Sequence, residues 1–405
     1  MRLLQEVVQG LKKIQANLQK LSPAQRMTPE AMALRAMTPE DLILRIWSAD
    51  YNDISMFSAG FKEVVEPEAI KQSLQEARDT YGPAETVGRD PKGRGYLVTT
   101  SDYVLPVLMD RTRSGQASGF FIKSPRSRLT SREEILAAMK ALAPRHSHLL
   151  TCNDETVAAC NASDPLAIGS AANLFVLQAL RQRVADRKLT LSQKMRLSEE
   201  FVSIPPGIIS GRKVNALETV KAVAEQMIAN SDKSATDLIM NLLGPRSLDG
   251  AAGRTPFLTT REFFKLKADP ELAARYGFGP IETRLEILEE LQNRPLPYVS
   301  QVREPHEEGA GWYASAEELC ETMGHLSKDP ALKLFLGSAE KADWHHVAYK
   351  GGSEIGTLSF TYDLETKGGT RYRFTAIWND STPINEPKAL ALMASLLEGL
   401  KVNVA

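Results

Sequence analysis

The sequence predicts an α+β protein of two packed units, and three observations support this. The chain has 405 residues, which is enough for two or three domains of ordinary size. Hydrophobic residues make up 43% and charged residues 24% of the chain, which is typical of folded globular proteins and excludes disordered, collagen-like and coiled-coil chains. Helical and strand patterns also fall in separate blocks, as they do in α+β folds.

The first segment, residues 1–37, opens with an expected amphipathic helix. Apolar residues recur at helical spacing over residues 2–21, with lysine and glutamine between them. The polar positions break any apolar core that a secretory signal needs, and no stretch of the chain approaches 18 apolar residues. We therefore expect a cytoplasmic protein with no membrane contact.

Residues 38–128 read as two helices followed by strands. The helix in TPEDLILRIW has Thr38 as its N-cap, and the helix in EPEAIKQSLQEARDTYG ends at Gly82. The runs RGYLVTT, YVLPVLMD and QASGFFIK are short and rich in β-branched and aromatic residues, which is typical of strands. This stretch resembles, in general pattern, the NTF2-like or steroid-isomerase-like α+β domain. An accessory domain without chemistry is the alternative that we favour.

Residues 129–405 form the expected second unit, in which strands from His148 are followed by a long helical block. The section from Trp344 to Asp380 alternates apolar and polar residues around glycine-rich turns, which predicts an antiparallel meander. A closing helix, EPKALALMASLLEGLKV, follows.

Charge and cysteine content exclude several classes of protein. Basic and acidic residues number 49 and 50, so the net charge of −1 does not favour nucleic acid or an anionic membrane. Cys152, Cys160 and Cys320 are too few and too scattered for a disulfide framework, and they form no zinc-binding pair. We expect a reducing compartment and no bound metal.

The segment DPLAIGSAANLFVLQALRQRV places Ser170 between an apolar strand and a helix. The free N–H groups and the dipole at a helix N-terminus favour negative charge, which suits a nucleophilic serine and an oxyanion. Seen alone, Ser170 is more simply a helix N-cap.

Two further sequence motifs follow Ser170 in the chain. They are Ser231-Asp232-Lys233 at a predicted helix start and Lys350-Gly351-Gly352-Ser353 near a strand end. Together with the Ser170 segment, and in this order, they resemble the Ser-x-x-Lys, Ser-Asp-Asn and Lys-Thr-Gly motifs of serine β-lactamases and penicillin-binding proteins. The resemblance to class A β-lactamases spans residues 148–402. With the preceding α+β domain, the arrangement is similar to β-lactamase-like proteins encoded in clavulanic acid biosynthesis clusters.

The resemblance implies a fold and a set of roles. It implies a five-stranded antiparallel sheet packed by helices, with Ser170 as the acylated nucleophile and no cofactor. Ser231 would pass a proton to the leaving group, and Lys350 would be a fixed positive charge. The oxyanion hole would use the backbone N–H groups of Ser170 and Ser353. The small residues Gly351 and Gly352 would let substrate lie along this edge strand.

Two departures from the family motifs bear on the catalytic base. Asn173 stands where the family has lysine, and an amide cannot take a proton. Lys233 stands where class A enzymes have asparagine. One hypothesis makes Lys233, or less favourably Lys350, the base for Ser170; the other, of equal weight, gives Lys233 a salt bridge with Asp232 or Asp237.

A third departure is the lack of a convincing Glu-x-x-Leu-Asn loop, which supplies the deacylating water in class A enzymes. The prediction is therefore a serine hydrolase that forms an acyl-Ser170 intermediate on a small ester or amide, β-lactam-like compounds included, with weak or no true β-lactamase turnover. The alternative is a catalytically impaired relative that binds a ligand or partner in its cleft. The sequence does not predict the oligomeric state.

Overall fold

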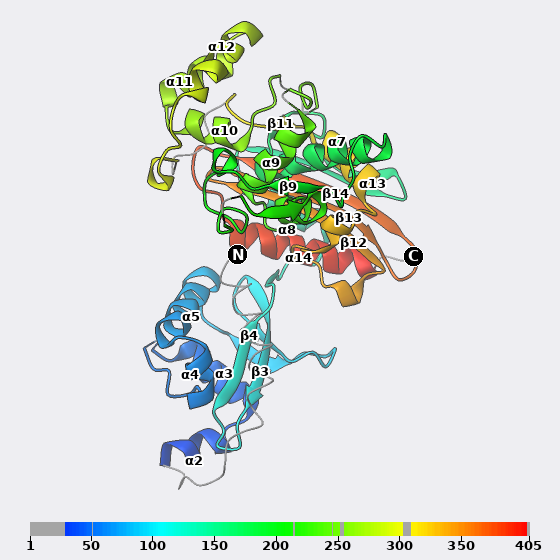
Figure 1. The fold of residues 1–405 in the computed structure, drawn as a ribbon. Coiled ribbons are helices and arrows are strands. Elements are labelled where there is room, and N and C mark those ends of the chain that lie inside the picture. The colour runs from blue at the N-terminus through cyan, green and yellow to red at the C-terminus, as the bar shows by residue number, and fades with distance from the viewer. Residues whose placement is uncertain are drawn as a thin grey trace. The chain divides into compact units, whose positions relative to one another are not determined.

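The computed structural model describes residues 29–50, 52–213, 215–244, 246–251, 255–302 and 309–402 (Figure 1). The expected amphipathic helix over residues 2–21 lies outside these ranges. The chain divides into two compact units, which are residues 1–135 with 387–399 and residues 136–386 with 400–405. Separate apolar clusters fill the two units. Within the described ranges, no helix is both long and apolar enough to cross a membrane.

The helices of the first unit start and end where local signals predict. They are α2 (Pro29–Ala36), α3 (Pro39–Ser48), α4 (Ala59–Val64) and α5 (Pro67–Tyr81). The Thr38 side chain accepts from the backbone N–H of Asp41 at 3.1 Å, and the Asp41 carboxylate returns to the Thr38 backbone, which completes a capping box. Helix α5 ends at Gly82, whose φ of 80° favours glycine. Both predicted helices are confirmed.

The sheet of the first unit is antiparallel, with the order β1-β2-β3-β4 and with β5 on β3. Its strands are β1 (Thr86–Arg89), β2 (Tyr96–Thr99), β3 (Tyr103–Arg111), β4 (Ala117–Ile122) and β5 (Arg126–Ser127). The three predicted strands are β2, β3 and β4; β1 was not predicted, and it forms a hairpin with β2. Ile43 and Trp47 of α3 pack with Leu105 and Val107 of β3, so helices cover one antiparallel sheet, as expected of an α+β unit.

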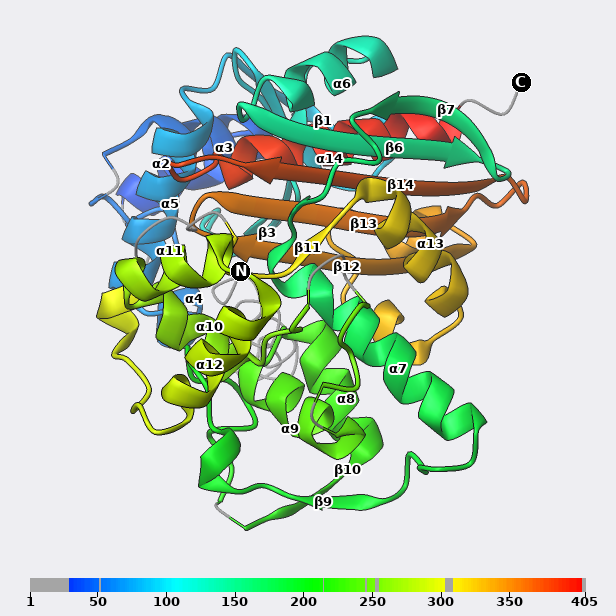
Figure 2. The ribbon, with the colours of Figure 1, turned by 90° about the horizontal axis from the view of Figure 1, so that it is seen from above.

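The second unit contains the expected five-stranded antiparallel sheet. Its order is β12-β13-β14-β6-β7, as Figure 2 shows. The strands are β6 (Arg145–Cys152), β7 (Glu155–Cys160), β12 (His346–Glu354), β13 (Thr357–Glu365) and β14 (Arg371–Asn379). The meander predicted from alternation is β12 to β14. Because β12 stands at one end of this order, the backbone on its outer side is not paired with another strand of the sheet.

Helices of the second unit gather beside β12 and in front of the sheet (Figure 2). They are α7 (Asn173–Ala185), α8 (Val220–Ala229), α9 (Lys233–Leu243), α10 (Thr260–Lys267), α11 (Pro270–Phe278), α12 (Ile281–Gln292) and α13 (Ala316–Leu326). The remaining helices are α6 (Arg132–Lys140) and α14 (Glu386–Val402). Helix α14 is the predicted closing helix, and α6 and α14 include residues of both units. Helix α7 buries Leu174, Leu177 and Leu180 as its periodicity predicts, against neighbours that include α9 and α13.

Short elements complete the second unit. They are the strands β8 (Leu166–Ala167), β9 (Lys194–Arg196), β10 (Leu217–Thr219) and β11 (Tyr313–Ala314) and the 3-10 turn η1 (Gly169–Ala172). Strand β8 pairs with β11, β9 pairs with β10, and η1 lies against β12 and β13. The start of α7, the start of α9 and the strand β12 thus meet around Ser170.

Candidate active site

The backbone that leads into Ser170 is fixed from three directions. Strand β8 pairs with β11 on one side. The Asn379 side chain of β14 accepts from the Ala167 N–H at 2.8 Å and donates to the Ala167 carbonyl at 2.9 Å. The Ser359 hydroxyl of β13 donates to the Ile168 carbonyl at 2.8 Å. Because each contact joins this segment to the sheet or to β11, the position of Ser170 is set by the fold rather than by its own loop.

Ser170 lies in η1, directly before α7, and only 6% of its surface is exposed. The preceding Gly169 has a φ of 53°, in the region that favours glycine. On the other side, β12 comes so close that a Cβ atom on Gly352 would lie 2.2 Å from the Ile168 carbonyl oxygen and 2.8 Å from the Ser170 nitrogen. Glycine at position 352 therefore allows the strand backbone to reach the serine.

Gly352→Ala tests this close approach. We expect the free energy of unfolding to fall by about 1–3 kcal/mol, because the added methyl group meets backbone atoms that cannot move independently. Covalent labelling of Ser170 should fall with it. Urea denaturation and probe labelling measure the two effects. Gly60→Ala is the control, since a Cβ atom there would have no neighbour within 4 Å. Wild-type stability in Gly352→Ala would contradict the close packing of β12 on the Ser170 turn.

The two carboxylates considered as salt-bridge partners of Lys233 bind backbone N–H groups instead. Asp232 is the N-cap of α9 and accepts from Ala235 at 3.0 Å and from Ile209 at 2.8 Å. Asp237 accepts from the first two residues of α10, Thr260 at 2.6 Å and Arg261 at 3.0 Å. Both carboxylates are 2% exposed. They hold the 203–211 loop and α10 against α9.

The Lys233 side chain points to the serine. Its Nζ donates to Ser170 Oγ at 2.5 Å, and the residue is 8% exposed. The ring centroid of Phe264, on α10, lies 6.0 Å from Nζ. The nearest carboxylate oxygen in the salt bridges of this lysine belongs to Glu354, at 3.5 Å. This geometry favours the hypothesis that pairs Lys233 with Ser170.

Lys350 and Ser231 form a second lysine–serine pair. Lys350 Nζ donates to Ser231 Oγ at 2.5 Å and to the Gly351 carbonyl at 2.9 Å, and Lys350 is 3% exposed. Burial, together with the positive charge of Lys233, lowers the pKa of Lys350 to about 7. Ser231 has a φ of 51°, a backbone conformation that is rare for residues other than glycine and is concentrated at functional sites.

Asn173 is the first residue of α7, three residues after the serine, and its side chain bonds to other helices. Its amide nitrogen donates to the Met227 carbonyl at 2.9 Å, and its amide oxygen accepts from Thr236 Oγ1 at 3.3 Å. Only 4% of the residue is exposed. These two hydrogen bonds join α7 to α8 and α9, so Asn173 has a packing role in this geometry.

The backbone groups expected to form an oxyanion hole lie on adjacent segments. A Cβ atom on Gly169 would be 3.6 Å from the Ser353 nitrogen, while a Cβ atom on Gly352 would be 2.8 Å from the Ser170 nitrogen. The Ser353 hydroxyl donates to Glu386 at 3.1 Å. The structure therefore brings the Ser170 turn and the Gly351–Ser353 segment together, and their roles stay predictions.

Sequence reasoning missed Glu354 and Lys267. The Glu354 carboxylate lies between Lys233 at 3.5 Å and Lys267 at 3.4 Å. Alternation along β12 puts Lys350, Gly352 and Glu354 on one face, and this signal was available in the sequence. Lys267 ends the segment FLTTREFFKLK, and no local pattern marks it as a neighbour of the site.

His146, His148 and His346 lie apart from these residues. His346 is at the far end of β12 from Ser353, and its Nε2 is 3.5 Å from Asp363. His146 and His148 contact each other at 2.9 Å, and burial lowers the pKa of both imidazoles. Within the described ranges, no group of three or more His, Cys, Asp and Glu side chains is arranged to hold a metal ion.

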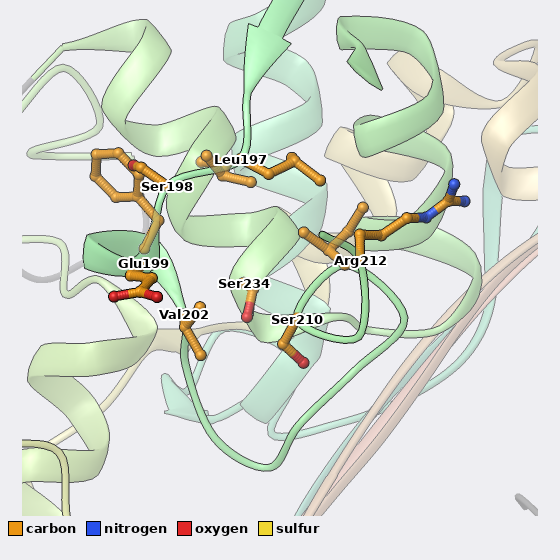
Figure 3. Close-up of a pocket in the computed structure, with 10 residues that line it drawn as sticks. Leu197, Ser198, Glu199, Val202, Ser210, Arg212 and Ser234 are labelled. Carbon is orange, nitrogen blue, oxygen red and sulfur yellow. The ribbon is translucent and has the colours of Figure 1, made fainter. Parts of the chain in front are cut away.

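A small pocket lies beside the first turns of α9 (Figure 3). It is lined by Leu197, Ser198, Glu199, Phe201, Val202, Ile209, Ser210, Arg212, Ser234 and Leu238. Ser234 follows Lys233 in the chain, but Ser170, Lys233 and Lys350 are not among the lining residues. This pocket is therefore distinct from the lysine–serine cluster.

Residues 132–263 match a family model, Beta-lactamase2, described as the β-lactamase enzyme family. A search of the curated proteins gave no match. Similar solved structures include a class A β-lactamase from Mycobacterium abscessus, at 17% identity and a TM-score of 0.45 over 66% of this chain and 98% of that one. A β-lactamase from Sphaerobacter thermophilus is 14% identical, with a TM-score of 0.46 over 67% of this chain and 98% of that one. PBP-A is also 14% identical, with a TM-score of 0.43 over 66% of this chain and 96% of that one.

The family match spans less than half of the chain, but it includes Ser170 and Lys233. This stretch of the chain is therefore similar to the β-lactamase enzyme family. Structural similarity at these identities and TM-scores assigns no activity.

Proposed function

We propose that the protein is a serine hydrolase that forms an acyl-enzyme on Ser170. The observation that carries this proposal is the 2.5 Å contact between Lys233 Nζ and Ser170 Oγ, both buried. A lysine in hydrogen-bond contact with a serine hydroxyl is the pairing that activates a nucleophile in the absence of histidine. Lys233 supplies this pairing although Asn173 replaces the lysine of the Ser-x-x-Lys motif.

In the proposed reaction, Ser170 Oγ bonds to the substrate carbonyl carbon as its proton passes to a neutral Lys233. The N–H groups of Ser170 and Ser353 bind the oxyanion. Ser231, held by Lys350, gives a proton to the leaving alcohol or amine when the bond to it breaks, and the Lys233–Lys350 pair returns a proton to Ser231. Water then hydrolyses the acyl-Ser170 ester and restores the serine.

The proposed substrate is a small ester or amide. An alkoxide leaves more readily than an amine, so esters make the smaller demand on this site. No Glu-x-x-Leu-Asn loop was found in the sequence to activate the deacylating water. We therefore propose slow deacylation with β-lactam-like compounds, and weak or no true β-lactamase turnover.

The lysine pair gives the reaction a pH dependence. The pKa of Lys350 is lowered to about 7 by burial and by the charge of Lys233, and loss of the Lys350 proton relieves the repulsion between the two ammonium groups. Because the reactive form has lost this proton, the acylation rate should rise about tenfold per pH unit below about 7 and level off above it. Labelling rates between pH 5 and 9 measure this, and a flat profile would exclude a lysine base.

We further propose that the first unit is an NTF2-like accessory domain, as in the proteins of clavulanic acid clusters that the chain resembles. Its helices on one antiparallel sheet support this. A cytoplasmic location is part of the same proposal, and the free thiols of Cys152, Cys160 and Cys320 support a reducing compartment.

The alternative function is binding without turnover. The observation in its favour is Asn173, whose amide is committed to Met227 and Thr236 and provides no base on α7. In this case the lysines would attract an anionic ligand rather than activate Ser170.

Intact mass separates the two functions. The wild-type protein is incubated with a fluorophosphonate, a penicillin and a cephalosporin in separate samples, with Ser170→Ala as the control. A stoichiometric adduct on the wild-type protein alone is the expected result. No adduct with any of the three reagents would leave the binding function as the better description.

A further inference from the structure

One carboxylate connects two buried lysines beside the candidate nucleophile. Glu354 Oε1 is 3.5 Å from Lys233 Nζ, and Oε2 is 3.4 Å from Lys267 Nζ. The exposed fractions of these side chains are 14% for Glu354, 10% for Lys233 and 4% for Lys267. Ion pairs at this depth are screened by salt and water much less than surface pairs.

Glu354 is held in this place by its position on β12. It is two residues beyond Gly352, the residue whose backbone lies against the Ser170 turn. The Glu354 Cγ atom lies 3.7 Å from where a Cβ atom of Gly169 would be, so its side chain runs beside that turn. Lys267 reaches the carboxylate from the last turn of α10, beside the ring of Phe263 at 5.7 Å.

Among the residues that the structure describes, the charges around Lys233 come from three elements. Strand β12 contributes Lys350 and Glu354, and α10 contributes Lys267. Asp232, next to Lys233 in the chain, binds backbone N–H groups. Glu354 therefore attracts Lys233, while Lys267 shares the same carboxylate and weakens that attraction.

We propose that Glu354, anchored by Lys267, is a positioning residue that keeps the Lys233 amino group on Ser170 Oγ and balances its charge. This inference rests on the proposed hydrolase function. A long lysine side chain has many rotamers, and a fixed carboxylate selects the one that reaches the serine. Because Lys267 shares the Glu354 carboxylate, Glu354 binds Lys233 less strongly, and the Lys233 amino group can still lose and regain its proton.

The test is the pH dependence of Ser170 labelling by a fluorophosphonate in Glu354→Gln and Lys267→Met. In Glu354→Gln the negative charge beside Lys233 is lost, so the rising limb of the curve, in which the labelling rate rises with pH, should move to lower pH by about one unit. The plateau rate at higher pH should fall about tenfold. Loss of the competing ammonium in Lys267→Met should move the limb to higher pH, by about the same amount.

Further variants separate this role from general damage to the fold. Glu354→Asp keeps the charge but shortens the side chain, so it should lose rate with little shift of the limb. Glu290→Gln removes an exposed carboxylate that pairs with Arg294 on α12, and it should match the wild-type protein. Limbs that coincide in Glu354→Gln and Lys267→Met, or that shift in the same direction, would overturn the proposal.

A second measurement does not depend on labelling. NMR titration of the full chain with ¹³Cε-labelled lysine follows the signals that disappear in Lys233→Met and Lys350→Met. The titration midpoints of these signals should move to lower pH in Glu354→Gln and to higher pH in Lys267→Met. If the wild-type protein forms no adduct, the hydrolase proposal fails; unmoved midpoints would instead reject the role of Glu354.

Discussion

Lys233→Met should lower the rate of Ser170 acylation by about 10²–10⁴, the range that general acid–base groups contribute. Methionine fills a similar length of buried space without an amino group, so the packing against Phe264 of α10 is largely kept. The Lys350 amino group is bonded to Ser231 and the Gly351 carbonyl, and it cannot replace the lost contact without leaving both. Rates of labelling by fluorophosphonate, followed by intact mass, measure the effect.

Lys265→Met is the matched control for this loss. Lys265 is 7% exposed, close to the 8% of Lys233, but its Nζ donates to the Leu291 carbonyl at 2.7 Å, away from the serine. We expect Lys265→Met to be labelled at the wild-type rate when measured under conditions where it is folded. Wild-type labelling of Lys233→Met would show that Lys233 is not the base and would direct attention to Lys350.

Elements with local signals could be predicted from the sequence. The Thr38 cap and the Gly82 stop depend on residues within one turn, and the meander of β12 to β14 follows from alternation and glycine turns. Strand β1 was missed because its sequence, TVGR, contains glycine and has no apolar alternation, and its pairing with β2 decides its conformation. Such a strand is defined by its partner rather than by its own residues.

Only the site residues that lie in recognisable sequence motifs could be predicted. Ser170, Ser231 and Lys350 were singled out by resemblance, but the choice between Ser170 and a carboxylate as the partner of Lys233 was left open. That choice depends on whether Asp232 and Asp237 are already occupied by backbone N–H groups of other segments. The Glu354–Lys267 pair joins residues 87 positions apart, so no spacing rule could reveal it.

Exchanging the side chains at positions 233 and 173 should place the catalytic base on α7, where the Ser-x-x-Lys motif has it. Lys233→Asn should lose acylation about as severely as Lys233→Met, and adding Asn173→Lys should recover at least about tenfold of that loss. The physical basis is proximity, since Thr236 of α9 donates to the Asn173 oxygen at 3.3 Å, so the two helices meet where either lysine would stand. Labelling rates of the single and double variants form a thermodynamic cycle.

Asn173→Lys alone should gain nothing. It removes the hydrogen bond to the Met227 carbonyl and adds an ammonium to a region that already holds Lys233 and Lys350, which repel each other. We expect the free energy of unfolding to fall by about 1–3 kcal/mol, because a buried carbonyl loses its partner. A large gain in labelling rate from Asn173→Lys alone would mean that the remaining machinery is intact but lacks a base. Lys233 would then be a positioning charge, since a site that already has a working base gains little from a second one.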